Sequence, residues 1–335
     1  MSLPARSPSR QDGENGAGKV TLVATVREEA GTLPEWWRSI LSQTRLPDEM
    51  VVVDGGSRDG TAEMLRELAG EAPFPVRVEV LPGCNIARGR NCAVSLAKGG
   101  IIAVTDAGCV LHPRWLENLL APLKEDPSVE LVAGFYQPLE GNWFEALSAC
   151  ATLPLPWEVR EGRFLPSSRS LAFRRGVWEK TGGYPEWLPI GEDMYFNQRW
   201  KEMGVKHRLC KDAVVWWRMR PDLPSLLRQY FLYARGDGEA GMYPRRHAVR
   251  FLTYGWLALV LSTGWGRRLL APTAAAGALY MGRRWLRIPF HMREKGMREK
   301  AAAFCVLPAL VFFIDAAKMA GYLAGLRSRA GRARR

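Results

Sequence analysis

Acidic side chains follow short apolar runs at three places in the first part of the sequence. Glu28 and Asp54 each come just after a run rich in valine, and Asp106 ends the run IIAVTD. A carboxylate at the end of a buried strand can accept hydrogen bonds from a base or a ribose. It can also hold a hard cation such as Mg²⁺ or Mn²⁺ beside phosphate oxygens. The expected chemistry is therefore the binding of a phosphate-bearing small molecule.

A structural explanation competes at each of these positions. Asp54 or Ser57 could cap the next helix, and Asp59 could tighten the turn between them. Asp106 could cap the helix expected from Pro113, but a gap of seven residues disfavours this role. We prefer the turn role for Asp59, and contact with a ligand for Asp54 and Asp106.

A further acidic pair, Glu192-Asp193, follows Gly191 and precedes an amphipathic run over residues 194–200. The dipole of a helix favours carboxylates at its first turn, and this alone would explain the pair. The functional interpretation is a general base that takes a proton from a hydroxyl nucleophile.

The elements that must position these side chains alternate along the chain from residue 20 to about residue 110. Nearly continuous apolar strands that alternate with helices are typical of a parallel sheet covered on both faces. Ligands bind beyond the carboxyl ends of such strands, so the acidic side chains should gather at one rim. The expected strands are 20–25, 50–54, 76–81 and 101–106, and the expected helices are 33–42, one ending at 68, 86–97 and 113–124.

Composition limits the class of protein. The chain has 335 residues, 47% of them hydrophobic and 24% charged, which excludes wholesale disorder. The six cysteines form no C-x-x-C pair, which argues against a zinc site and a disulfide framework. Residues 1–19 are polar and contain no apolar core of a signal peptide, so we expect a disordered polar tail there.

The charge is concentrated at the C-terminal end. The net charge is +13, and residues 283–335 carry 13 Lys/Arg against three acidic residues. Residues 251–266, 269–282 and 301–314 are apolar and uncharged, with basic residues at the breaks between them. Basic flanks beside apolar helices favour a membrane, either as two short spans or as helices lying in the interface. A soluble helical subdomain is the alternative. Nucleic acid is not expected as a partner, because no recognisable module accompanies the charge.

Four blocks in order resemble the large family 2 glycosyltransferases of the GT-A fold. They are VVVDGGSRDGT, NIARGRNCAV, AVTDAGCVLHPRWLENL and GGYPEWLPIGEDMYFNQRW, within residues 20–236. The resemblance implies an α/β fold with a mainly parallel Rossmann-like sheet flanked by helices, and the apolar, basic C-terminal part adds an expected helical membrane-associated region. It also implies transfer of a sugar from a nucleotide-diphosphate donor with inversion at the anomeric carbon, assisted by Mg²⁺ or Mn²⁺.

The resemblance implies roles for residues at matching positions. Glu28 falls at the acidic position near the nucleotide, and Asp54 at the aspartate that contacts the base. Arg90 and Asn91 match an element that lines the donor site. Asp106 matches the first aspartate of the D-x-D motif, and so becomes the predicted metal ligand and a donor-site residue.

The second half of the resemblance supplies the catalytic residue. Glu192 and Asp193 match the E-D motif, with Asp193 as the implied catalytic base and Glu192 in the donor site. Gln229 matches the glutamine of the Q-x-x-R-W motif found in processive members, and we also place it in the donor site.

Two departures from the family pattern change the expectation. Gly108 replaces the second aspartate of D-x-D, so metal binding would depend on Asp106, the diphosphate and water. Leu232 and Tyr233 replace the Arg-Trp of the processive motif, which favours transfer of a single sugar. Arg228 and Arg235 become candidate diphosphate partners, although a solvated basic helix face explains them equally well.

The sequence thus predicts a GT-A catalytic domain over residues 20–240 and a membrane-associated helical region with a basic tail over residues 241–335. The preferred function is an inverting glycosyltransferase at the inner face of the cell membrane, acting on a hydroxyl acceptor that is lipid-linked or part of the cell envelope. The alternative is a non-catalytic nucleotide-sugar-binding membrane scaffold, which the missing second aspartate motivates. A Rossmann oxidoreductase is set aside, because TVREEAG after the first strand lacks the G-x-G-x-x-G turn.

Overall fold

The chain folds into two compact units, and neither of them is one continuous piece of sequence. The structure is a computed structural model that describes residues 18–164, 166–262 and 266–333. The first unit contains the residues up to 137 together with Arg160–Trp217. The second contains Pro138–Val159 together with the residues from 218 onward. Packing therefore groups residues 218–240 with the C-terminal helices, and the predicted division of roles at residue 240 stays a prediction.

The predicted polar tail at residues 1–19 lies outside the described residues, apart from Gly18 and Lys19.

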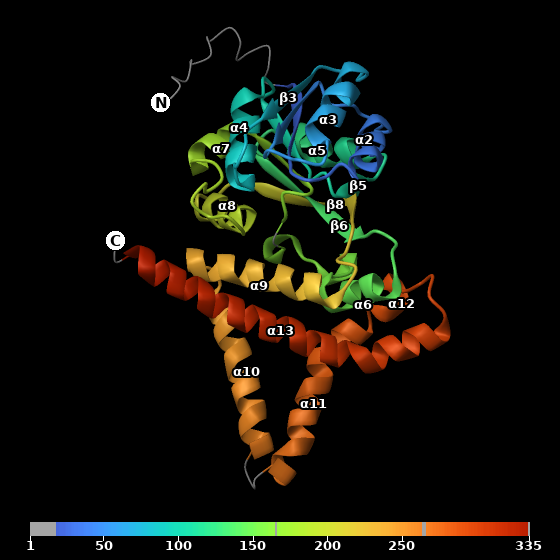
Figure 1. Cartoon of the computed structure of the whole chain (residues 1–335), viewed down its shortest axis with the longest axis vertical. Coiled ribbons are helices and arrows are strands. Elements are labelled where there is room, and N and C mark those ends of the chain that lie inside the picture. Colours follow the sequence, from blue (N-terminus) through green and yellow to red (C-terminus); the bar gives the residue numbers. More distant parts are fainter. Residues whose placement is uncertain (1–17, 165, 263–265, 334–335) are drawn as a thin grey trace. The chain divides into compact units, whose positions relative to one another are not determined.

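Within the described residues, the first unit contains one sheet of eight strands in the order β3-β2-β1-β4-β7-β6-β8-β5. Figure 1 shows this sheet between helices. The predicted α/β arrangement of a sheet flanked by helices is confirmed. The strands are β1 Val20–Val26, β2 Glu49–Asp54, β3 Val76–Val80, β4 Ile101–Val104, β5 Cys109–Leu111, β6 Leu131–Pro138, β7 Leu171–Arg174 and β8 His207–Trp217.

The first four strands run parallel, as their sequences predict. In β1, Val23 pairs with Val51 of β2 on one side and with Val104 of β4 on the other. All three side chains are buried, at 0–1% exposure. This is the burial expected for a parallel strand whose two faces are both covered. The shared register brings the carboxyl ends of β1, β2 and β4 to the same edge of the sheet.

The remaining strand pairs make the sheet mixed. β7 pairs antiparallel with β4 and with β6, and β5 pairs antiparallel with β8. The sequence analysis predicts no strand in residues 131–138, 171–174 or 207–217. The sheet is therefore less parallel than predicted, although β1 to β4 are parallel to one another as expected.

The helices of the first unit cover the sheet with apolar faces. In α2, Leu33, Trp36 and Ile40 recur at helical spacing and are 0% exposed. These side chains join the apolar residues of β1 and β2 in one core cluster. The helices are α2 Leu33–Leu41, α3 Thr61–Gly70, α4 Ile86–Leu96, α5 Trp115–Glu125, α7 Arg175–Thr181 and α8 Glu192–Glu202, with a short 3-10 helix η2 Glu161–Arg163.

The second unit is helical in the described residues. α9 and α13 lie side by side, and α10 and α11 form a hairpin (Figure 1). Its elements are α6 Trp143–Thr152, η1 Pro156–Glu158, α9 Leu223–Ala240, α10 Pro244–Ser262, α11 Gly266–Trp285, α12 Ile288–His291 and α13 Met297–Ala333.

Glycines let α9 and α13 approach closely. A Cβ atom on Gly325 would collide with the backbone oxygen of Arg235, and one on Gly321 with the backbone oxygen of Phe231. Gly321 and Gly325 are four residues apart and lie on one face of α13. The spacing is that of a small-xxx-small helix contact, in which backbones pack without side chains between them.

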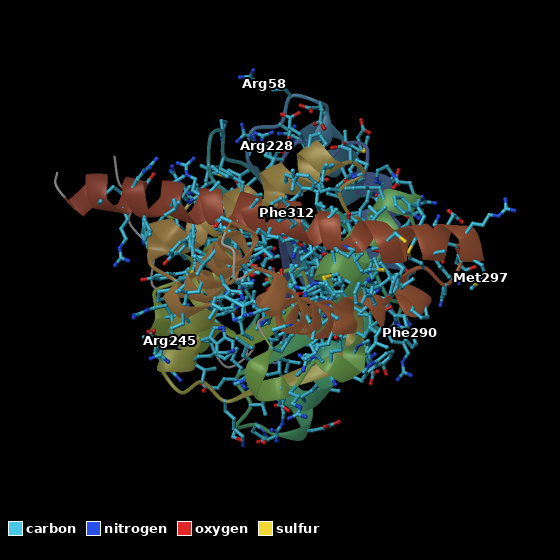
Figure 2. All side chains as sticks on the ribbon, turned by 90° about the horizontal axis from the view of Figure 1, so that it is seen from below. Arg58, Arg228, Arg245, Phe290, Met297 and Phe312 are labelled. Carbon is cyan, nitrogen blue, oxygen red and sulfur yellow. The ribbon has the colours of Figure 1, made fainter. Side chains whose placement is uncertain are left out.

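The hairpin exposes large apolar side chains. Leu252 and Leu261 of α10 are 72% and 68% exposed, and Leu279 of α11 is 82% exposed. On α13, Phe312 projects on the face seen in Figure 2 and is 47% exposed. One helix in the described part of the chain, Met297–Arg332, is long and apolar enough to cross a membrane.

Candidate active site

The loops that follow β1 and β2 are tied together by side chains. Asp54 is fully buried and accepts hydrogen bonds from the N–H groups of Gly56 (2.7 Å) and Ser57 (2.8 Å) and from the Ser57 hydroxyl (2.6 Å). The Ser57 hydroxyl accepts from the Glu28 N–H (2.8 Å), and the Glu28 carboxylate accepts from the Arg58 N–H (3.1 Å). Asp54 thus shapes this rim, and Glu28 lies exposed on it. Their predicted contacts with a nucleotide stay predictions.

The turn role preferred for Asp59 is confirmed. Its carboxylate accepts hydrogen bonds from the N–H groups of Thr61 (3.1 Å) and Ala30 (3.0 Å). The hydrogen bond from the Thr61 hydroxyl is the main reason that the pKa of Asp59 lies below its usual range. Asp59 therefore fastens the β2–α3 turn to the loop after β1.

Arg90 joins two of the predicted acidic groups. It extends from α4 and donates through Nη2 to Asp106 Oδ1 (2.7 Å) and through Nη1 to Glu192 Oε1. Its guanidinium carbon lies 5.4 Å from the ring centre of Tyr184. The Arg90 side chain is 3% exposed, so this ion-paired cation is held inside the protein. The structure thereby brings Arg90, Asp106 and Glu192 together, and their predicted roles in donor and metal binding stay predictions.

Burial controls the charges of this cluster. Burial alone would lower the pKa of Arg90, but the carboxylates of Asp106 and Glu192 outweigh it and raise that pKa. Burial raises the pKa of Glu192 to about 7, although the Arg90 guanidinium opposes this shift. The Arg90 Nε is buried and has no hydrogen-bond partner among the described residues. Arg90 is therefore a permanent cation, whereas Glu192 can exchange a proton near neutral pH.

Asn91 acts as a brace within the protein. Its Oδ1 accepts from the Tyr184 N–H (2.9 Å) and from the Trp178 indole N–H (3.0 Å). Its Nδ2 donates to the Tyr184 carbonyl (2.8 Å) and to the Glu186 carboxylate (3.0 Å). These four bonds use the hydrogen-bonding capacity of an amide side chain. Asn91 thus holds the segment that carries Tyr184 against α4, and its predicted contact with a donor remains a prediction.

Asp193 stands at the first turn of α8. Gly191, with φ of +87°, ends the preceding loop in a conformation that favours glycine. Asp193 Oδ1 accepts from the Met194 N–H (2.8 Å), and Oδ2 accepts from the Ser167 hydroxyl (3.3 Å). The helix dipole favours an ionised carboxylate at this position. Asp193 therefore has a fixed direction and keeps acceptor capacity, as a general base requires.

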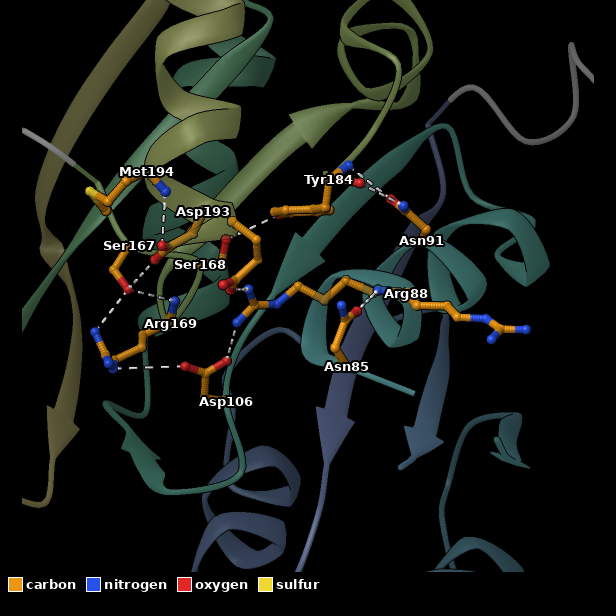
Figure 3. Close-up of polar contacts among 12 residues, drawn as sticks. Asn85, Arg88, Asn91, Asp106, Ser167, Ser168, Arg169, Tyr184, Asp193 and Met194 are labelled. Carbon is orange, nitrogen blue, oxygen red and sulfur yellow. Dashed lines mark hydrogen bonds and ion pairs between the residues drawn. The ribbon is translucent and has the colours of Figure 1, made fainter. Parts of the chain in front are cut away.

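Sequence reasoning missed two residues that link the acidic groups. Arg169 and Ser167 lie in the turn before β7, and Arg169 Nη1 donates to the Ser167 hydroxyl (2.9 Å). Arg169 Nε lies 3.7 Å from Asp106 Oδ2 (Figure 3). The Arg169 guanidinium stacks 4.0 Å from the ring centre of Trp217. The only sequence signal is an arginine among three serines. Hydrogen bonds and an ion pair thus connect Asp193, through Ser167 and Arg169, to Asp106.

Gln229 belongs to the other unit. It is buried in α9, and its Nε2 donates to the Tyr233 hydroxyl (3.0 Å). Arg228 is exposed on the same helix (Figure 2). Arg235 Nε donates to the buried Glu239 carboxylate (2.9 Å). The predicted donor-site role of Gln229 and the diphosphate role considered for the two arginines stay predictions.

The residues around Asp106 do not form a metal site by themselves. Both carboxylate oxygens face guanidinium groups, at 2.7 Å from Arg90 and 3.7 Å from Arg169. No group of three His, Cys, Asp or Glu side chains that could hold a metal ion occurs among the described residues. A Cβ on Gly108 would meet nothing within 4 Å, so the missing carboxylate leaves open space.

Comparison with known sequences identifies the kind of domain. Residues 21–175 match the family described as glycosyl transferase family 2. The glycosyltransferase AglE of Haloferax volcanii is 26% identical over 232 residues, which cover 68% of this chain and 75% of AglE. The O-antigen chain rhamnosyltransferase RfbN of Salmonella typhimurium is 26% identical over 222 residues, which cover 59% of this chain and 65% of RfbN.

Comparison with solved structures supports the fold. The mannosyltransferase PcManGT from Pyrobaculum calidifontis, in complex with GDP-Man and Mn²⁺, superposes with a TM-score of 0.60 at 21% identity. The superposition covers 93% of this chain and 88% of that one. At this level of identity the likeness concerns the fold, which is the predicted GT-A type.

Proposed function

The chain is a family 2 glycosyltransferase, and we propose that it transfers one sugar from a nucleotide-diphosphate donor to a hydroxyl acceptor with inversion. The observation that carries this proposal is the network from Asp193 through Ser167 and Arg169 to Asp106 and Arg90. It offers a carboxylate for a proton at one end and ion-paired guanidinium groups for phosphate at the other.

The proposed reaction is a single displacement. Asp193 takes the proton of the acceptor hydroxyl as its oxygen bonds to the anomeric carbon. The bond from that carbon to the diphosphate breaks, and its electron pair leaves with the diphosphate. Attack from the face opposite the leaving group inverts the configuration. Asp193 is suited to this role because the Ser167 and Met194 donors fix its direction.

Donor binding is proposed at the rim formed by the ends of β1, β2 and β4. Glu28, Asp54 and Asp106 follow these strands, whose register brings their ends to one edge. The test is a thermal-shift screen with UDP-, GDP-, CDP- and dTDP-sugars in the presence of Mn²⁺, followed by assays for hydrolysis or transfer. A stabilising shift with one nucleotide, accompanied by turnover, supports the proposal. Absence of a shift with every nucleotide contradicts it.

A divalent ion, Mg²⁺ or Mn²⁺, is proposed to bind only together with the donor. Asp106 is the residue that would hold it, and the remaining ligands would be phosphate oxygens and water. When bound, the ion would neutralise charge on the departing diphosphate. We expect weak affinity for the ion alone, because two guanidinium groups already face Asp106.

Transfer of a single sugar, rather than polymer synthesis, is supported by the region around Gln229. Leu232 and Tyr233 stand where processive members have Arg-Trp, and the Tyr233 hydroxyl is engaged by Gln229. Product analysis with a defined acceptor tests this point: one added sugar is expected, and a ladder of longer products would contradict it.

Attachment to the inner face of a membrane is proposed for the second unit, with a lipid-linked or cell-envelope acceptor. The support is the exposed apolar surface of α10 and α11, flanked by basic residues. Their uncharged stretches, residues 251–262 and 269–282, correspond to about 18–21 Å of helix and would reach only part of the way through a hydrocarbon core.

Membrane attachment can be tested on the hairpin. Replacing Leu252 and Leu279 with Glu should abolish co-sedimentation with phosphatidylglycerol vesicles while nucleotide binding is kept. Leu41→Glu, at an exposed leucine of the first unit, is the matched control. Unchanged sedimentation of the hairpin variant would contradict the proposed attachment.

The transferase identity removes the alternative of a non-catalytic scaffold.

A further inference from the structure

Arg169 is placed at the junction of the site rather than on its surface. It lies in the turn before β7, where its side chain is 18% exposed. It donates to Ser167 (2.9 Å), lies 3.7 Å from Asp106, and rests 4.0 Å from the ring centre of Trp217. Stacking on an aromatic face fixes the plane of a guanidinium and leaves its N–H groups directed outward along its edge.

The two arginines beside Asp106 differ in how tightly they are held. Arg90 is 3% exposed and makes hydrogen-bonded ion pairs with both Asp106 and Glu192. The Arg169–Asp106 separation of 3.7 Å is too long for a hydrogen bond, so this pair is a loose one. Of the two arginines, Arg169 is therefore the one whose contact with Asp106 a ligand of stronger negative charge can replace, whereas Arg90 is committed to its carboxylates.

Gly108 stands where the family pattern has a second aspartate, so one negative charge is missing beside Asp106. With one carboxylate in place of two, Asp106 lies beside two guanidinium groups, of which Arg90 is also paired with Glu192. Guanidinium groups bind phosphate oxygens through paired N–H donors, with good geometry and strength.

We infer that Arg169 binds the diphosphate of the donor, exchanging its loose contact with Asp106 for phosphate oxygens. This inference rests on the proposed function, because it requires a nucleotide-diphosphate donor. Arg169 then stabilises the negative charge that develops on the departing diphosphate. Because Arg169 has moved from Asp106 to the phosphate oxygens, Oδ2 of Asp106 no longer faces a guanidinium group. Through Ser167, the same side chain also connects the leaving-group end of the site to Asp193.

The test compares nucleoside diphosphates with monophosphates by isothermal titration with Mn²⁺, using the pairs GDP/GMP, UDP/UMP, CDP/CMP and dTDP/dTMP on the full chain. For the pair that the wild type binds, Arg169→Ala should weaken the diphosphate about tenfold and change the monophosphate less than about twofold. Arg169→Lys, which keeps the charge but not the fork, should fall between the two.

Two control variants separate binding from structure. Ser167→Ala removes the link to Asp193 and the hydrogen bond from Arg169 but keeps the guanidinium, and should weaken the diphosphate less than Arg169→Ala does. Arg208→Ala removes an exposed arginine of the same unit that pairs with Glu161, and should change neither affinity. Melting curves of all variants establish that each is folded.

The outcomes are distinct. A ratio of diphosphate to monophosphate affinity that is the same in Arg169→Ala and wild type overturns the inference and leaves the proposed function standing. Failure of the wild type to bind any of the diphosphates overturns the proposed function and the inference with it.

Discussion

The two units hold their elements together in opposite ways. At the rim of the first unit, charged side chains from distant segments pair inside the protein, as Arg90 does with Asp106 and Glu192. In the second unit, the contact between α9 and α13 depends on the absence of side chains at Gly321 and Gly325. The ion pairs of the first unit hold charged side chains at the edge of the sheet where donor binding is proposed. The second unit packs helices tightly while large apolar residues remain on the outside, which supports the proposed membrane attachment.

Removing the central cation should have the largest effect on stability in this comparison. Arg90→Ala leaves Asp106 and Glu192 without their shared partner, and we expect a loss of about 3–5 kcal/mol in the free energy of unfolding. Urea unfolding measures it. The control is Arg114→Ala, which removes an exposed ion pair with Glu117 and should cost less than about 1 kcal/mol. Similar losses in both variants would contradict the buried role of Arg90.

The same cluster predicts a dependence of stability on pH. Burial raises the pKa of Glu192 from 4.5 to about 7, so between these values the folded protein keeps a proton that the unfolded chain releases. The unfolded state then binds fewer protons, and stability falls as pH rises through this window. Below pH about 4.5 and above pH about 7 this contribution no longer changes with pH.

Glu192→Gln isolates this effect, because glutamine keeps an acceptor for Arg90 but does not titrate. Unfolding free energies measured from pH 4.5 to pH 7 should fall less steeply in the variant than in wild type. Parallel curves for the two proteins would show that Glu192 titrates normally.

The glycine contact of the second unit should respond to a single methyl group. Gly325→Ala places a Cβ against the backbone oxygen of Arg235, which cannot move independently of α9. We expect a loss of about 1–3 kcal/mol. Gly255→Ala in α10, where a Cβ meets nothing within 4 Å, should be neutral or stabilising by up to about 1 kcal/mol. Thermal unfolding in detergent distinguishes them, and equal melting temperatures would contradict the close packing.

Restoring the missing carboxylate tests whether a divalent ion binds beside Asp106 in the first unit. Gly108→Asp has open space for its side chain and recreates the D-x-D pattern beside Asp106. We expect half-maximal activity at about tenfold less Mn²⁺, because hard cations gain affinity with each carboxylate. Gly108→Ala is the control for the added Cβ. A Mn²⁺ requirement unchanged in the aspartate variant would mean that no ion binds at this corner.

Sequence reasoning was strongest where the signal is local. The four apolar runs predicted β1 to β4, and the position of Asp54 and Asp106 after two of them followed directly. It was weakest where partners are distant, since Arg90 and Glu192 are 102 positions apart and only the fold brings them together. Arg169 gave only the weak signal of an arginine among serines, because its position depends on Trp217 and Asp106, which belong to other strands and loops. The four-residue spacing of Gly321 and Gly325 is a local pattern that is typical of close helix packing.

The most direct test of the central claim is the Asp193→Asn variant, assayed for sugar transfer and for nucleotide binding. The account predicts that transfer falls by about a thousandfold while the affinity for the nucleotide stays within about twofold of wild type, because only the proton acceptor is lost. Asp126→Asn, at a surface turn that pairs with Lys206, should behave as wild type in both assays. Turnover of Asp193→Asn at the wild-type rate would contradict the assignment of Asp193 as the base.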